Sequence, residues 1–147
     1  MRVVLDASVT VAWFLQDESS TESGPLLNYV AKAGAAVPQI WKMEVANVFT
    51  QAVRRGRISD SHRERAMAAL RALPIREDAE GTSNVWTTVV DIADRFQLSI
   101  YDATYLELSA RTGLPIATAD KAMKAAALSM GRRLYSPDWQ IPDNTTV

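Results

Sequence analysis

Short apolar runs alternate along the chain with longer stretches in which apolar residues recur every three or four positions. The short runs show no alternation of polar and apolar residues, and a polar residue or a proline ends most of them, as is typical of buried parallel strands. They predict strands at Arg2–Leu5, Ala36–Pro38 and Leu114–Thr118, a short extended piece at Ile75, and a last strand at Arg133–Tyr135.

The longer stretches predict helices that each bury one apolar face. These helices are expected to begin at Ser8, shortly before Leu26, near Trp41, at Ser59, at Thr82 or Ser83, near Asp102 and at Asp120. Four of them stop at a glycine or a proline, residues that commonly end helices: Gly34, Gly56, Pro74 and Gly113. Because short strands alternate with helices, the sequence predicts an α/β fold around a mainly parallel sheet.

The length of 147 residues predicts a single domain over 1–147, with a polar loop or helix start at 17–23 and a surface tail at 137–147. The chain has no cysteine and one histidine, His62. Disulfides, thiolate metal sites and a cysteine nucleophile are therefore excluded, and so is a histidine-rich zinc site. Any chemistry must depend mainly on carboxylates, hydroxyls, arginine and lysine. His62 itself is expected on the surface of a polar helix.

The net charge of −1 gives no overall attraction to nucleic acid. The segment Arg54–Arg76, however, carries seven arginines and two acidic residues. It forms either a solvated helix surface or a basic face for a phosphate backbone, with Arg54, Arg55 and Arg57 as candidate contacts. Asp6 interrupts the apolar N-terminal segment and no long uncharged apolar stretch follows, so we expect a cytoplasmic protein without membrane contact.

Four acidic residues occupy unusual places in this pattern. Asp6 ends the first strand, Asp120 follows the strand at 114–118, Asp102 lies at a helix start, and Glu44 lies within an apolar helical stretch. Taken singly, three of them can be turn or helix-start residues, but a carboxylate among apolar neighbours needs a positive partner. Since sites in open α/β sheets form beyond the carboxyl ends of strands, these acids are candidates to converge on Mg²⁺ or Mn²⁺.

Hydroxyl and amide groups accompany these acids. Ser8 follows Asp6 by two positions, and Thr118 precedes Asp120 by two. Both can orient a ligand or a metal-bound water, although Ser8 can equally serve as a helix cap. Asn47 lies one helical turn beyond Glu44 and can share its face.

The ordered set of VVLDASV, WKMEVANV, IYDATYLELSA and IATADKAM resembles the four-acid pattern of PIN-domain ribonucleases, and the length matches the VapC-type toxins of toxin–antitoxin systems. The resemblance implies a three-layer α/β/α sandwich, with Asp6, Glu44, Asp102 and Asp120 as catalytic residues around one or two Mg²⁺ or Mn²⁺ ions. It implies Asp6, Asp102 and Asp120 as metal ligands and Ser8, Asn47 and Thr118 as supporting residues.

The same resemblance implies that the protein is an endoribonuclease that hydrolyses RNA by a metal-activated water and leaves a 5′-phosphate and a 3′-hydroxyl. It also implies a homodimer and a small antitoxin partner. Some apolar residues of the early helices are expected to remain exposed as a partner groove, while most lie in the core: Trp13, Phe14, Leu26, Leu27, Trp41 and Phe49.

Three other functions compete with this interpretation. A haloacid-dehalogenase-type phosphatase would also begin with a strand-end aspartate, but it needs a second acid where this chain has Ser8. A receiver domain would need a lysine after a strand, and none is well placed. A catalytically silent module that binds RNA or protein stays open, although the presence of all four acids argues against it. Metal-dependent RNA cleavage distinguishes the ribonuclease from all three.

Overall fold

The computed structural model describes residues 2–15 and 22–139. In chain order its elements are β1 (Val3–Leu5), α1 (Ala7–Val11), α2 (Ser23–Ala33), β2 (Ala35–Val37), α3 (Ile40–Arg54), α4 (Asp60–Ala72), β3 (Ile75–Glu77), the 3₁₀ helix η2 (Gly81–Asn84), the π-helix η3 (Val85–Val89), α5 (Val90–Phe96), α6 (Ile100–Thr112), β4 (Ile116–Ala117) and α7 (Lys121–Ser129). Most of the expected tail, 140–147, and most of the expected loop at 17–23 lie outside the described residues.

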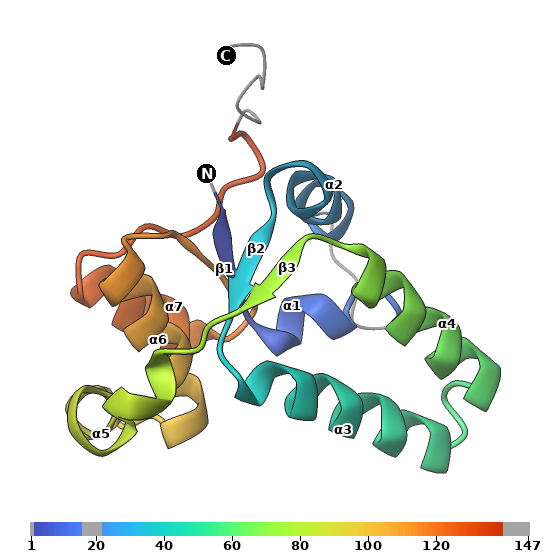
Figure 1. The fold of residues 1–147 in the computed structure, drawn as a ribbon, viewed down its shortest axis with the longest axis horizontal. Coiled ribbons are helices and arrows are strands. Elements are labelled where there is room, and N and C mark those ends of the chain that lie inside the picture. The colour runs from blue at the N-terminus through green and yellow to red at the C-terminus, as the bar shows by residue number, and fades with distance from the viewer. Residues whose placement is uncertain (1, 16–21, 140–147) are drawn as a thin grey trace.

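The four strands form one sheet in the order β3-β2-β1-β4, and every pairing in it is parallel. Helices α1–α4 lie on one side of the sheet and α5–α7 on the other (Figure 1). This arrangement confirms the expected α/β fold with a parallel sheet between two helical layers. Among the described residues, no helix has the length and apolar character needed to cross a membrane.

The core lies between the central strand β1 and the helices on either side of it. All three residues of β1 are fully buried, and α6 packs against both β1 and β4. Of the apolar residues expected on the early helices, Leu26, Trp41 and Phe49 are buried in the core. Trp13, Phe14 and Leu27 are half-buried. These helices therefore serve mainly as core, as their spacing predicts.

The helix starts agree in part with the expected caps. Ser59 caps α4 by accepting a hydrogen bond from the His62 N–H, and Asp120 caps α7, as predicted. The cap expected at Ser8 is wrong: Asp6 is the cap residue of α1, and Ser8 lies inside the helix. His62 is half-buried rather than exposed, because a ring nitrogen contacts the carbonyl oxygen of Phe14 at 2.8 Å.

Two further elements differ from the expectation. The helix predicted from Thr82 or Ser83 begins with the 3₁₀ turn η2 and the π turn η3, which is rich in β-branched residues that crowd a regular α-helix. The strand expected at 133–135 is reduced to a single bridge between Leu134 and Ile116. Two backbone hydrogen bonds hold this bridge, because the Ile116 N–H donates to the Arg133 carbonyl and the Tyr135 N–H donates to the Ile116 carbonyl.

Candidate active site

The strand order places Asp6 and Thr118 at one point of the sheet. β1 and β4 are neighbours, and Asp6 and Thr118 directly follow them. The chain leaves β1 toward β2 on one side, whereas β4 lies on its other side. Such a switch point, at the carboxyl ends of the strands, is where open α/β sheets form their ligand sites.

Asp6 is held by two hydroxyl groups. The Ser8 Oγ and the Thr118 Oγ1 both donate to its Oδ2, at 2.6 and 2.8 Å. These hydroxyls in turn accept backbone N–H groups, Ser8 from Ala119 and Thr118 from Asp120, so the two strand ends are joined. Burial raises the pKa of Asp6, and the nearby Asp102 raises it further, against the effect of the two hydroxyls. The predicted supporting positions of Ser8 and Thr118 are therefore in contact with Asp6.

Glu44 enters the site from α3, where the sequence places it among apolar residues. The Tyr105 hydroxyl, from α6, donates to its Oε1 at 2.6 Å. Burial raises the pKa of Glu44, and the negative charges of Asp6 and Asp102 add to this effect. Burial and the bond to Glu44 also raise the pKa of Tyr105, which keeps its phenol protonated and able to donate.

Asp102 and Asp120 come from the first turns of two helices. Asp102 lies in the first turn of α6, where its N–H binds the Ser99 cap, so it is not itself the cap. Burial, followed by the negative charge of Asp120, raises the pKa of Asp102. Asp120 is exposed and uses its Oδ1 to accept the Met123 N–H at the start of α7.

Together these residues form an acidic cluster, defined as Asp6, Glu44, Asp102 and Asp120. Each of the three with a raised pKa owes part of the shift to another member. Across 2–15 and 22–139, no three His, Cys, Asp or Glu side chains gather closely enough to hold a metal ion. The cluster is coupled by charge without forming a closed cage.

The donor chemistry of the acidic cluster nevertheless fits a hard divalent cation. Its donors are carboxylate oxygens, and their mutual repulsion favours a positive charge between them. Mg²⁺ is usually bound through one or two carboxylates while it keeps several waters, so it does not need an all-protein cage. The metal-ligand roles of Asp6, Asp102 and Asp120 stay a prediction.

Other predicted site residues are not in contact with the acidic cluster. Asn47 is exposed on α3, and no hydrogen bond between it and the acidic cluster is found in the described part of the chain. Arg54, Arg55 and Arg57 are exposed at the end of α3 and in the turn that follows it. That turn lies at the far end of the α3–α4 hairpin from the sheet (Figure 1). Any contact with RNA there would be made at a distance from the acids.

Tyr105 is the site residue that the sequence reasoning missed. The spacing assigned it to the apolar stripe of its helix, and it is indeed fully buried. A buried tyrosine hydroxyl, however, usually finds a hydrogen-bond partner. The sequence pattern alone gave no hydrogen-bond partner for the Glu44 carboxylate or for the buried Tyr105 hydroxyl. In the structure, each is the hydrogen-bond partner of the other.

The fold and this site define a class of α/β protein with an acidic centre at the carboxyl edge of a parallel sheet. A sequence profile of the PIN domain matches residues 3–128, and the chain belongs to the PIN domain family. Members of this family are typically nucleases, and PIN nucleases generally use Mg²⁺ or Mn²⁺.

Comparison with solved structures supports the same fold. The structure is similar to the crystal structure of PAE2754 from Pyrobaculum aerophilum, with a TM-score of 0.60 and 19% sequence identity over 86% of each chain. At this identity the similarity concerns the fold alone. No curated protein sequence matches the chain significantly.

Proposed function

We propose that this protein is a metal-dependent endoribonuclease whose catalytic residues are the acidic cluster. The observation that supports the proposal is the charge coupling of four carboxylates, which follow β1 and β4 or lie on α3 and α6 near the switch point of the sheet. Carboxylates held together against their mutual repulsion are costly unless they serve a cation or a substrate. Membership of a family of nucleases supports the same conclusion.

The chain's own residues have distinct roles in this proposal. A divalent cation, when bound, supplies a water of lowered pKa and stabilises the developing charge on the phosphate. Asp6 and Asp102, with Asp120, would hold such a cation together with its remaining waters. Ser8 and Thr118 fix the orientation of Asp6, as Tyr105 fixes that of Glu44. The single histidine has a ring nitrogen on a backbone carbonyl, so the carboxylates are the available acid–base groups.

Cleavage of a labelled single-stranded RNA, with and without metal, tests the proposal. We expect cleavage in Mg²⁺ or Mn²⁺, none in excess EDTA, and a loss of at least about a hundredfold in Asp102→Asn, the scale of general acid–base and electrostatic contributions. Asp94→Asn, an exposed acid of α5, is the matched control and should cleave normally. Cleavage that persists in EDTA contradicts the mechanism. Binding of RNA without cleavage would support the silent-module alternative.

The basic segment is the proposed path of the RNA backbone. Arg54 follows Glu44 by ten positions on α3, or about 15 Å at the helical rise per residue. A single-stranded RNA a few nucleotides long can span this distance between Glu44 and Arg54. Neutralising Arg54, Arg55 and Arg57 together should weaken RNA binding and reduce the slope of affinity against salt concentration. An unchanged slope would mean that these arginines form a solvated surface and do not contact the RNA backbone.

A toxin role in the cytoplasm, with a small antitoxin partner and a homodimeric state, completes the proposal. A groove of about 530 Å³ between α3, α4 and β3 supports it, since Trp41, Met67, Leu70 and Ile75 line it with apolar surface. Such a groove suits an amphipathic helix of a partner. Expression alone should arrest growth, and co-expression with a cognate antitoxin should restore it. Growth unaffected by expression contradicts the toxin role.

A further inference from the structure

A small pocket lies between the beginnings of α3 and α6, and both helices carry members of the acidic cluster. The pocket has a volume of about 190 Å³ and is lined by Gln39 at the start of α3, Tyr101 in the first turn of α6, and Val85 of η3. Glu44 lies just over one turn further along α3, and Asp102 directly follows Tyr101. Ile40, which also lines the pocket, precedes Glu44 by one helical turn, or about 6 Å, so a group held in this pocket would lie close to the acidic cluster.

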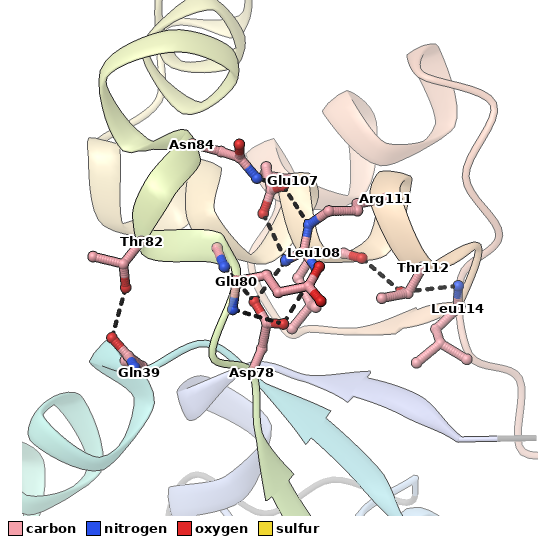
Figure 2. Close-up of polar contacts among 11 residues, drawn as sticks. Gln39, Asp78, Glu80, Thr82, Asn84, Glu107, Leu108, Arg111, Thr112 and Leu114 are labelled. Carbon is pink, nitrogen blue, oxygen red and sulfur yellow. Dashed lines mark hydrogen bonds and ion pairs between the residues drawn. The ribbon is translucent and has the colours of Figure 1, made fainter.

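An ion-pair network supports the floor of the pocket. The network consists of Arg111, Asp78, Glu80 and Glu107, and Figure 2 shows it linking the segment after β3 to α6. Asp78 and Glu107 line the pocket, and Gly81 covers them closely. A Cβ atom at Gly81 would lie 2.7 Å from the Asp78 Oδ2, so the floor has no space for a side chain there.

The charge of the lining selects what can enter. Among the described residues that line the pocket, the charged ones are the carboxylates Asp78 and Glu107, with no lysine or arginine. Both are paired with Arg111, so the lining offers a phosphate group no free cationic partner. Gln39 and Thr82, joined by a hydrogen bond of 2.6 Å, add a polar wall that can pair with the edge of an uncharged ring.

The rim of the pocket carries one aromatic ring that is exposed to solvent, that of Tyr101. The side chain of Tyr101 is 58% exposed, and Trp86, which follows the lining residue Val85, is 91% exposed. Trp86 belongs to the π-helix η3, and π-helical turns occur frequently at functional sites. Exposed aromatic rings beside a polar pocket are the groups on which proteins stack the bases of single-stranded RNA.

We propose that this pocket holds one unstacked base of the RNA substrate, next to the phosphate that is cleaved, with Tyr101 as the stacking residue. The proposal rests on the proposed ribonuclease function. A pocket of 190 Å³ is below the range of sites for drug-sized ligands and suits one planar ring. The floor offers the phosphate no free cation, which favours the uncharged base as the part of a nucleotide that enters. Tyr101 then positions the chain so that its phosphate lies over the acidic cluster.

A titration with the four uncharged nucleosides, followed by amide NMR shifts, tests the pocket without any cleavage. We expect shifts at Thr82, Tyr101 and Thr104, which line the pocket. They should be retained in Tyr101→Phe, which keeps the ring, and lost in Tyr101→Ala. Leu128→Ala, which removes an exposed apolar side chain of α7, is the matched control. An absence of shifts at these residues with all four nucleosides overturns the proposal.

Affinity for a short single-stranded RNA in EDTA supplies the second measurement. Loss of one base–aromatic stack should weaken binding in Tyr101→Ala by about 5- to 150-fold. The slope of affinity against salt concentration should not change, because no phosphate contact is removed. A lowered slope in Tyr101→Ala contradicts base stacking.

The two proposals fail in different ways. If nucleosides bind at the pocket but RNA is not cleaved in metal, the ribonuclease proposal fails and the pocket remains. If RNA is cleaved but Tyr101→Ala binds it as tightly as the unchanged protein, the pocket proposal fails alone. If Tyr101→Ala and Trp86→Ala instead convert a dimer into a monomer without altering nucleoside binding, the aromatic rim is an interface between two copies, and the pocket proposal is overturned.

Discussion

Replacement of Arg111 by methionine tests how strongly the ion-pair network holds the segment after β3 on α6. The guanidinium donates to both carboxylate oxygens of Asp78 and of Glu107, whose side chains are only 12% and 4% exposed. Removing one member of a buried ion pair costs about 3–5 kcal/mol, because a buried charge is left unpaired. Since Arg111 itself is partly solvated, we expect the lower end of this range, about 3 kcal/mol.

The loss of unfolding free energy in Arg111→Met should be smaller in acid than at neutral pH. Burial raises the pKa of Asp78, but hydrogen bonds from Arg111 and the Gly81 N–H outweigh it and bring the pKa below the usual 3.8. Because its pKa is lowered by folding, Asp78 stabilises the folded protein at pH values above its unfolded-state pKa. This stabilisation is lost as the pH falls through the folded-state pKa. The difference in unfolding free energy between the unchanged protein and Arg111→Met should therefore be largest at neutral pH and should decrease below about pH 4.

Urea unfolding followed by tryptophan fluorescence and far-UV circular dichroism measures this difference. The matched control is Arg71→Met, an exposed arginine in the last turn of α4, which should change the unfolding free energy by no more than about 0.5 kcal/mol. A second variant, Glu107→Gln in the Arg111→Met background, should recover part of the loss, because it removes an uncompensated charge. A loss below about 1 kcal/mol, or one that stays constant into acid, refutes the reasoning.

Two further predictions concern the acidic cluster. Burial and neighbouring acids raise the pKa values of Asp6, Glu44 and Asp102. In the metal-free protein, their unfavourable contribution to the free energy of unfolding is therefore absent below about pH 4 and grows as the pH rises. Asp6→Asn should stabilise the metal-free protein at pH 7 but not at pH 4, as measured by urea unfolding at both pH values. Tyr105→Phe removes the hydroxyl that binds Glu44 and should lower the unfolding free energy by about 1–2 kcal/mol and reduce RNA cleavage, whereas equal stability would show that this bond contributes nothing.

Local sequence determined most of the secondary structure and the identity of the acids. The apolar runs before Asp6 and Asp120 have the character of buried strands, and β1 and β4 form there. Ser59 and Asp120 are good helix caps by their chemistry, and both cap a helix. These features depend on interactions between residues a few positions apart, which a linear pattern records.

Tertiary structure alone decided which side chains meet. Glu44 and Tyr105 are 61 positions apart, and Asp6 and Thr118 are 112 apart, yet each pair shares a hydrogen bond because the parallel sheet brings their elements to one edge. The position of Asn47 on the solvent side of α3 was equally hidden, since neighbouring positions on one helix face can differ in exposure.

The same limit applies to the pocket beside the acidic cluster. The spacing of Glu107 and Arg111 on one helix is that of an ion pair, but nothing in the sequence marks Asp78 as their partner, because it precedes Arg111 by 33 positions and lies in an irregular segment. The exposure of Tyr101, one position from the half-buried Asp102, depends on how α6 packs against the sheet. The sequence alone determined the chemical groups available to this protein, whereas the sheet order and helix packing decided which of them became neighbours, because contacts between distant residues exist only once the core has formed.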